Sequence, residues 1–176
     1  MNNGSPAAIR ALAADEAETR IGELAAVLAD AVAHGASVNF LAGFGHAQAV
    51  AFWRGQLPGI ADASRVLVVA EIDGTIIGTA VLTLAHQPNA PHRAEIGKML
   101  VHSSERRRGL GTRLLAATEN VARRLGRTLI LLDTQTDSAG ERLYRSCGWT
   151  PYGVVPGHSL TPDGRLAPTT FFYKKV

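Results

Sequence analysis

Residues 95–115 read EIGKMLVHSSERRRGLGTRLL, an apolar, strand-like run that passes through a basic loop into a helix. The first backbone N–H groups of a helix have no intrahelical partner, and the positive end of the helix dipole lies there. Three consecutive arginines, 106–108, add positive charge to the loop. Gly109 and Gly111 lack the Cβ atoms that would keep a ligand away from the main chain. The loop is therefore a candidate phosphate-binding site.

The spacing of this loop, Arg-x-x-Gly-x-Gly, differs from both common nucleotide-binding fingerprints. A Walker loop requires Gly, four residues and then Gly-Lys-Ser/Thr, and the dinucleotide fingerprint requires three glycines. A basic loop before a helix is more often only a solvated helix start. Binding of phosphate by this loop therefore needs support from other segments of the chain.

Such support comes from the segments on either side of the loop. Glu95 and the run Met99-Leu100-Val101 precede it, an apolar strand at 128–133 ends in Asp133, and residues 139–149 read AGERLYRSCGW. In this order the segments resemble the GCN5-related N-acetyltransferase (GNAT) superfamily. The resemblance implies an α/β (α+β) fold: a central, mixed, mostly antiparallel sheet of about seven strands, with a parallel pair at the cofactor splay and about four flanking helices.

A closer resemblance lies outside the basic loop. The segments HGASV (34–38), QPN (87–89), RAE (93–95) and TPDGRL (161–166) look like those of the tabtoxin-resistance acetyltransferases, which inactivate a β-lactam amino-acid toxin. This likeness implies that the acceptor is a small-molecule amine, such as a tabtoxinine-β-lactam-like toxin or another antimicrobial, and that acetylation confers resistance.

Composition sets the class of protein and its surroundings. The chain has 176 residues, of which 46% are hydrophobic and 19% charged, so we expect a globular domain over 9–176 after a flexible tail at 1–8. A single cysteine excludes an intramolecular disulfide. No signal-peptide pattern or bilayer-length apolar run is present, so we expect a cytoplasmic protein without membrane contact.

The net charge of +3 does not predict a nucleic-acid partner, because the basic residues are dispersed and aromatic residues do not alternate with them. The six histidines are scattered without ligand spacing, so no metal is expected. The sequence leaves the oligomeric state open and is compatible with a homodimer.

Apolar periodicity predicts the order of the elements. We expect helices over 16–33, 46–57, 110–125 and 138–146, the second ending before Pro58-Gly59. Strands are expected over 9–13, 66–71, 76–84, 95–101, 128–133, 150–154 and 169–174, with a hairpin turn at Asp73-Gly74. The Gly- and Pro-rich segment 155–168 is expected to be a loop at the rim of a pocket. The aromatic residues Phe40, Phe44, Phe52 and Trp53 favour the core over a pocket wall.

The resemblance assigns acetyl-CoA to the strand and loop. Backbone groups at the end of the strand would hold the pantetheine arm and polarise the thioester, and the loop with the first turn of the helix would bind the pyrophosphate. The residues so assigned are Met99, Leu100, Val101, Arg106, Arg107, Arg108, Gly109, Leu110, Gly111 and Thr112.

Two carboxylates are candidates for the amine chemistry. Strict alternation places Glu95 on the same strand face as Gly97 and Met99, where it would act as a general base or anchor an ammonium. The alternative is a solvated carboxylate paired with Arg93. Asp133 lies where ligands commonly bind, beyond the carboxyl end of a parallel strand, as a second base or anchor, or as a cap for the following turn.

A tyrosine is the candidate acid. By resemblance, Tyr144 occupies the position of the residue that protonates the leaving thiolate, although it would also serve as a core tyrosine. Asp137 and Ser138 stand where many relatives have asparagine, which puts one cofactor hydrogen bond in doubt. Cys147 has no neighbouring histidine and is expected to be a small packing residue.

The sequence thus favours an N-acetyltransferase that works by direct attack of the amine in a ternary complex. Two rivals stay open. A protein N-terminus or lysine would require an open groove, and a non-catalytic acyl-CoA-binding module would show no turnover.

Overall fold

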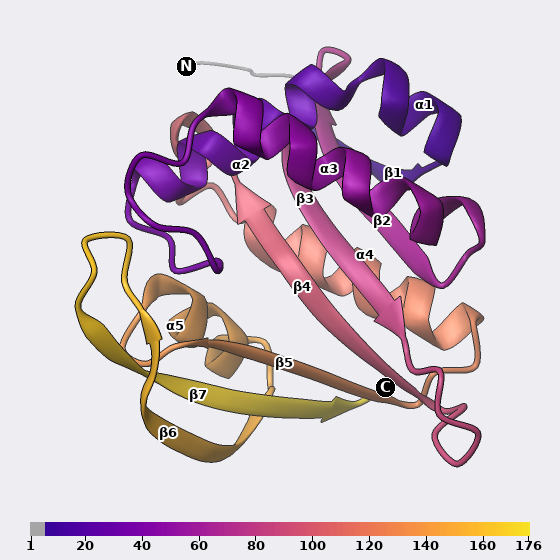
Figure 1. Cartoon of the computed structure of the whole chain (residues 1–176). Coiled ribbons are helices and arrows are strands. Elements are labelled where there is room, and N and C mark those ends of the chain that lie inside the picture. The colour runs from indigo at the N-terminus through magenta and orange to yellow at the C-terminus, as the bar shows by residue number, and fades with distance from the viewer. Residues whose placement is uncertain (1–5) are drawn as a thin grey trace.

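A seven-stranded sheet forms the centre of the computed structural model, which describes residues 6–176 (Figure 1). In chain order the strands are β1 (Ala8–Leu12), β2 (Arg65–Ile72), β3 (Thr75–Leu84), β4 (Arg93–Val101), β5 (Leu129–Gln135), β6 (Thr150–Leu160) and β7 (Leu166–Lys175). The helices are α1 (Ala14–Thr19), α2 (Ile21–Ala33), α3 (His46–Ala61), α4 (Leu110–Arg124) and α5 (Ala139–Ser146), with a 3₁₀ turn, η1 (Ser103–Glu105).

The strand order is β1-β2-β3-β4-β5-β7-β6, and β4 and β5 form the one parallel pair. The other neighbouring strands pair antiparallel. The fold predicted from the sequence, a mixed sheet of seven strands with one parallel pair, is therefore confirmed. The sharp turn at Asp73-Gly74 also forms, with φ of 49° and 79° at the two residues, as a two-residue hairpin requires.

The helices cover both faces of the sheet. One apolar cluster joins α4 and α5 to one face and contains Leu114, Tyr144 and Phe172. A second cluster joins α1, α2 and α3 to the other face. In this second cluster the fully buried Trp53 donates from Nε1 to the carbonyl of Leu24 at 2.9 Å, which fixes α3 against α2. The predicted core position of Trp53 is confirmed.

Some element boundaries differ from prediction. The expected helix 16–33 divides at Arg20, giving five helices where about four were expected. The second helix continues through Pro58 to Ala61, contrary to prediction. Proline removes a single hydrogen bond near the helix end, and the last turn is held by Asp62, whose N–H donates to the Pro58 carbonyl.

The segment 155–168 was predicted to be a loop, which is wrong for most of its length. Strand β6 continues to Leu160 and β7 begins at Leu166, leaving only a short turn. Pro151 and Pro156 fit because β6 is an edge strand whose pairing shifts register at both places. None of the residues 155–168 lines the cleft described below.

Strand β1 begins at Ala8, one residue before the strand expected over 9–13. Of the tail expected at 1–8, residues 1–5 lie outside the described residues. Ala7 is buried, with its carbonyl accepting from Arg113, and Ala8 begins β1. No helix within residues 6–176 is long and apolar enough to cross a membrane.

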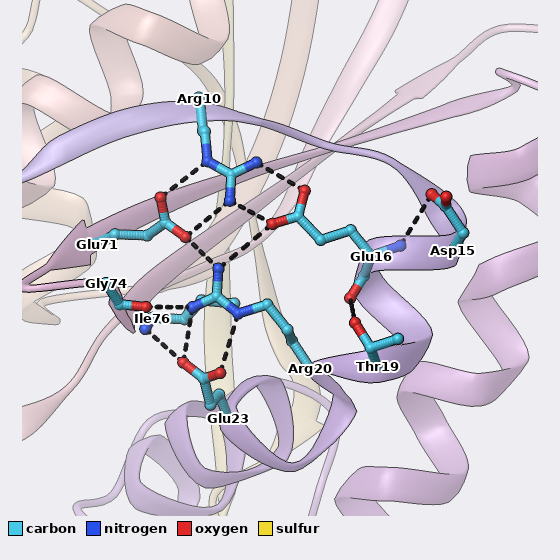
Figure 2. Close-up of polar contacts among 9 residues, drawn as sticks. All are labelled: Arg10, Asp15, Glu16, Thr19, Arg20, Glu23, Glu71, Gly74 and Ile76. Carbon is cyan, nitrogen blue, oxygen red and sulfur yellow. Dashed lines mark hydrogen bonds and ion pairs between the residues drawn. The ribbon is translucent and has the colours of Figure 1, made fainter.

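An ion-pair network joins the N-terminal elements (Figure 2). Glu71 at the end of β2 is only 8% exposed and accepts hydrogen bonds from Arg10 of β1 and from Arg20 between α1 and α2. Each arginine has a further carboxylate partner, Glu16 for Arg10 and Glu23 for Arg20. The network therefore ties β1, α1 and α2 to the β2–β3 hairpin.

Candidate active site between the splayed strands

Strands β4 and β5 are paired over only three residues each. Residues 93–95 of β4 pair with residues 129–131 of β5, and beyond them β4 continues with β3 while β5 continues with β7. The two strands diverge in Figure 1. The second half of β4 thus has no strand partner on its β5 side, and its backbone polar groups on that side are available to a ligand.

A bulge at Lys98 changes the direction of the β4 side chains. Lys98 has φ of 47°, and the β3–β4 register shifts between Thr79 and Val81. Thr79 supports the bulge, because its hydroxyl donates to the Lys98 carbonyl at 3.0 Å. A left-handed residue other than glycine costs about 1–3 kcal/mol, so the neighbouring structure must hold it in place.

The bulge corrects one prediction. Ala94 and Ile96 face the α4 side, and Met99 also packs on that side. Glu95 alternates with Ala94 and Ile96 and so faces the side of α2 and α3. Glu95 and Met99 therefore lie on opposite faces, contrary to the expectation from strict alternation, because the extra residue inverts the pattern.

The splay opens into a cleft of about 620 Å³. Its walls come from both sides of the sheet: the end of α2 and the loop after it, the second half of β4, the basic loop and the first turn of α4, the end of β5, and α5. The predicted residues that line it are Met99, Leu100, Val101, Arg106, Arg107, Gly109, Leu110, Gly111, Thr112, Asp133 and Tyr144. Arg108 and Glu95 do not line it.

The basic loop presents an open helix terminus to the cleft. Gly109 precedes α4 with φ of 74°, and within the described part of the chain no side chain caps the helix. Arg106 is anchored by donation from Nε to the Val101 carbonyl at 3.0 Å. Arg108 instead pairs with Glu105 at 2.8 Å on the surface. Uncapped N–H groups, the helix dipole and two arginines are the features of an anion site.

Different physical constraints require glycine at the two glycine positions of the loop. A Cβ at Gly109 would meet no atom of the chain within 4 Å, so its left-handed backbone is what requires glycine. A Cβ at Gly111 would lie 3.2 Å from Leu143 Cδ2, so this glycine allows α4 and α5 to approach. The sequence argument, which cited only the approach of a ligand, missed both reasons.

Asp30 links α2 to the start of the basic loop. Its carboxylate accepts from the backbone N–H and the hydroxyl of Ser103, both at 2.7 Å. His102 and Arg106 lie within 4 Å of the same carboxylate. The Ser103 hydrogen bonds, with His102 and His34 nearby, lower the pKa of Asp30 although burial opposes them. The apolar periodicity of the sequence did not identify Asp30 as a functional candidate, because Asp30 lies on an otherwise ordinary amphipathic helix.

Three charged side chains share the face of the sheet next to α2 and α3. Leu131 pairs with Glu95, and Asp133 lies two residues further along β5, on the same face. Lys98 points to this face too, with Nζ 5.3 Å from the centre of the Phe52 ring. Within residues 6–176 no ion-pair partner lies within 4 Å of any of the three, so the Arg93 partner considered for Glu95 does not form.

The electrostatics of this group favour proton transfer. The surrounding protein, and then the charge of Asp133, raise the pKa of Glu95, while Arg93 and Lys98 act in the opposite direction. Burial lowers the pKa of the Lys98 ammonium, and the two carboxylates oppose that change. Glu95 is nevertheless exposed to solvent, and a glutamate with a raised pKa beside the cleft is a candidate general base.

Tyr144 is both a core residue and a cleft residue. It lies on α5, is 6% exposed, and packs against Trp149 and Phe172 with ring centres 6.1 and 6.0 Å away. Burial, with the charge of Asp133, raises its pKa well above the ordinary value, so the phenol stays protonated and can act as a donor. The tyrosine also lines the cleft.

The remaining candidates take structural positions. Ser138 caps α5 by accepting from the Glu141 N–H, and it lines the cleft, whereas Asp137 has φ of 62° in the preceding turn. Cys147 is half-buried and packs against the α4-side core, as expected. Across residues 6–176 no group of three His, Cys, Asp or Glu residues has the arrangement of a metal site.

The predicted core position of the phenylalanines needs refinement. Phe40 and Phe44 stack with ring centres 3.9 Å apart, and Phe52 meets Phe40 edge-on at 5.4 Å. All three are only partly buried against the α2–α3 core. Two of them also contact Lys98, so the cluster is both core and wall of the charged face.

The family model of the acetyltransferase (GNAT) family matches residues 30–149, which include the splay, the bulge, the basic loop and α5. The chain belongs to this family. It is therefore an acetyltransferase by family membership, and the GNAT resemblance predicted from the sequence is confirmed.

Solved structures of acetyltransferases share the fold across nearly the whole chain. The yncA acetyltransferase from Salmonella typhimurium, solved with its cofactor acetyl-CoA, has a TM-score of 0.76 at 21% identity, covering 97% of this chain and 94% of that one. An N-acetyltransferase from Staphylococcus aureus Mu50 has a TM-score of 0.78 at 17% identity, covering 97% and 99%. The ribosomal-protein-alanine N-acetyltransferase from Brucella melitensis has a TM-score of 0.76 at 23% identity, covering 96% and 99%. At such identities these likenesses show the fold and leave the acceptor open.

Proposed function

We propose that this GNAT protein transfers the acetyl group of acetyl-CoA to the amine of a small molecule, by direct attack in a ternary complex. One observation carries the proposal: a single cleft runs from the uncapped N-terminus of α4, through the β4–β5 splay, to the end of β5 at Asp133. The two ends of this cleft suit an anionic cofactor and a cationic acceptor respectively.

The residues at the α4 end fit acetyl-CoA. The N–H groups of the first turn, with Arg106 and Arg107, would bind the pyrophosphate. The free edge of β4 from Met99 to Val101 would hold the pantetheine arm and donate to the thioester carbonyl. A donor there stabilises the negative charge that develops on the carbonyl oxygen during attack.

The residues at the other end would handle protons. An alkylammonium with an ordinary pKa must lose a proton before its nitrogen can attack. We assign this step to Glu95 or Asp133, with the other carboxylate holding the ammonium. The new N–C bond forms as the C–S bond breaks, and the Tyr144 phenol supplies the proton for the departing sulfur.

The loop between α2 and α3 favours a small acceptor. It lines the cleft with residues 36–38 and is joined to the β6–β7 turn, where the N–H of Ala42 donates to the Pro162 carbonyl at 2.7 Å. We infer that this contact narrows the approach to the cleft. A protein acceptor, such as the ribosomal-protein alanine for which the Brucella melitensis relative is named, would then require the contact to open.

The narrower prediction of a tabtoxinine-β-lactam-like acceptor, and of resistance by acetylation, rests on short sequence segments. Two of them lie near the acceptor end: residues 34–38 line the cleft, and residues 161–166 form the β6–β7 turn that Ala42 contacts. The comparisons do not support this identity, which stays a prediction.

The deciding experiment measures acetyl-CoA consumption with a panel of small amines, one β-lactam amino acid among them, and with peptides. A small amine should be used and peptides should not. The control is Glu95→Gln combined with Asp133→Asn, which should bind acetyl-CoA in calorimetry but not turn over. Preferred use of peptides would contradict the small-acceptor proposal, and binding of acetyl-CoA without turnover across the panel would favour the acyl-CoA-binding module.

A further inference from the structure

The acceptor end of the cleft contains a cation that acetyl transfer does not use. Lys98 lines the cleft from the β4 bulge, on the same face as Glu95 and Asp133. Its positive φ of 47° and the hydrogen bond from Thr79 to its carbonyl fix the backbone from which the side chain extends. The direction in which the side chain leaves the strand is therefore set by the fold.

Two aromatic rings hold the ammonium in place. Nζ lies 5.7 Å from the centre of the Phe40 ring and 5.3 Å from that of Phe52. Such contacts offset part of the desolvation of the cation. Ring faces are poor hydrogen-bond acceptors, however, so they leave the three N–H donors of the ammonium available to a ligand.

No protein anion supplies the missing partner. Among the described side chains, no carboxylate approaches Lys98 Nζ within 4 Å, and Nζ makes no hydrogen bond. Glu95 and Asp133 act on the ammonium only from a greater distance. The cleft lining therefore includes one carboxylate, Asp133, and one ammonium, Lys98, while Glu95 lies outside the lining on the same face of the sheet. Among the described residues, none of the three has a partner within ion-pair distance.

We propose that Lys98 binds a carboxylate of the acceptor, so that the substrate is a small amino acid whose ammonium lies toward Glu95 and Asp133. The proposal rests on the function proposed above and narrows its substrate class. A carboxylate fits better than a phosphate, because the two nearby carboxylates would repel a dianion more strongly than a monoanion. The Phe40 and Phe52 rings would contact the apolar part of the substrate beside the carboxylate.

The kinetic test uses matched pairs of amino acids and their carboxamides, which differ in the acid group. The acid should have the higher kcat/KM by about tenfold to hundredfold, the range for one hydrogen bond between charged groups. Lys98→Met should remove this preference by slowing the acids more than the amides, and Lys98→Arg should restore part of it. Lys175→Met, an exposed lysine of β7, is the matched control and should change neither.

A binding measurement separates this proposal from the proposed function. The sequence contains three lysines, Lys98, Lys174 and Lys175, so protein labelled with ¹³C at the lysine ε-carbon gives three signals by NMR. The Lys98 signal is assigned as the one that Lys98→Met removes. Amino acids of the panel should shift this signal in the CoA-bound protein, and their carboxamides should not.

The outcomes are distinct. A shift of the Lys98 signal by acids, without turnover of any amine, would support the carboxylate site and contradict the proposed function. Absence of any shift with every acid would overturn the carboxylate site, even in an active enzyme. Equal kcat/KM for acids and amides, or an equal loss for both in Lys98→Met, would overturn it as well.

Discussion

Replacing Glu71 by glutamine should measurably destabilise the fold without touching the cleft. Glu71 accepts from Arg10 at 2.8 and 2.9 Å and from Arg20, and it is 8% exposed (Figure 2). The glutamine amide keeps one acceptor oxygen, but its NH₂ group would face the N–H donors of Arg10 and Arg20 and could not accept from them. Both guanidinium groups retain another carboxylate, so neither is left as an unpaired buried charge.

The magnitude follows from this partial loss. Hydrogen bonds to charged groups contribute about 1.5–3 kcal/mol each, but the remaining carboxylates and the 41% exposure of the Arg10 side chain reduce the net effect. We expect the free energy of unfolding to fall by about 2 kcal/mol. For a chain of this length that corresponds to a decrease in Tm of about 4–8 °C.

The pH dependence has a defined sign. The bonds from the two arginines lower the pKa of Glu71 below its ordinary value of 4.5 although burial opposes them. Its contribution to stability is therefore fully present above the unfolded-state pKa and is lost as the pH falls through the lower, folded-state pKa. The difference in Tm between wild type and Glu71→Gln should be largest near pH 7 and should shrink below about pH 4.5.

Urea and thermal unfolding at pH 7 and at acidic pH test this expectation, with Glu18→Gln as the matched control. Glu18 pairs with Arg54 at 3.6 Å, and both side chains are at least 50% exposed, so its loss should cost less than about 0.5 kcal/mol. Equal stability of Glu71→Gln and wild type at pH 7, or a difference that grows on acidification, would refute the network argument.

The other predictions concern the cleft. Of the variants Glu95→Gln and Asp133→Asn, the one that lacks the base should lose kcat, and the one that lacks the anchor should mainly raise the amine KM. If Glu95 is the base, the activity of the wild type should rise as the pH increases through the raised pKa of Glu95. Profiles of kcat against pH in which both variants keep the wild-type acidic limb would contradict the two-carboxylate scheme. Tyr144→Phe should lower kcat about tenfold to ten-thousandfold with unchanged acetyl-CoA affinity in calorimetry, and wild-type turnover would leave Tyr144 a packing residue. Gly109→Ala should reduce stability by about 1–2 kcal/mol in thermal unfolding because of its φ of 74°, and an unchanged Tm would show that the loop relaxes to another conformation.

Local patterns in the sequence were sufficient for the order of the strands and for most of the residues that line the α4 end of the cleft. The Asp73-Gly74 turn and the almost wholly apolar run before Asp133 each identify one element by its own chemistry, namely a left-handed turn and an apolar strand. The division at Arg20 and the continuation of α3 through Pro58 could not be predicted in this way. The division depends on contacts with distant residues, such as the hydrogen bond from Arg20 to Glu71. The continuation of α3 depends on the position of Pro58 near the helix end, where the loss of one hydrogen bond is tolerated.

The bulge at Lys98 was missed although the sequence contains a signal for it. If β4 alternated strictly, Lys98 would lie with Ala94 and Ile96 and would enter the apolar cluster under α4, where an unpaired ammonium costs several kcal/mol. The next apolar residue on that side is instead Met99, three positions after Ile96. A strand whose apolar spacing changes once from two to three predicts an inserted residue at the change.

The single inserted residue explains why neighbouring side chains of β4 point to opposite faces of the sheet. It directs Met99 toward the α4 side and turns Lys98 to the opposite face, where Glu95, Asp133 and the Phe40–Phe52 pair lie. Because of the register shift, the carbonyl of Lys98 accepts a hydrogen bond from the Thr79 hydroxyl in place of a regular backbone hydrogen bond between β3 and β4. Under the proposed function, contacts to the cofactor and to the acceptor would come from adjacent residues of one strand. A thioester held along β4 would then meet an amine held by side chains on the other face of the sheet.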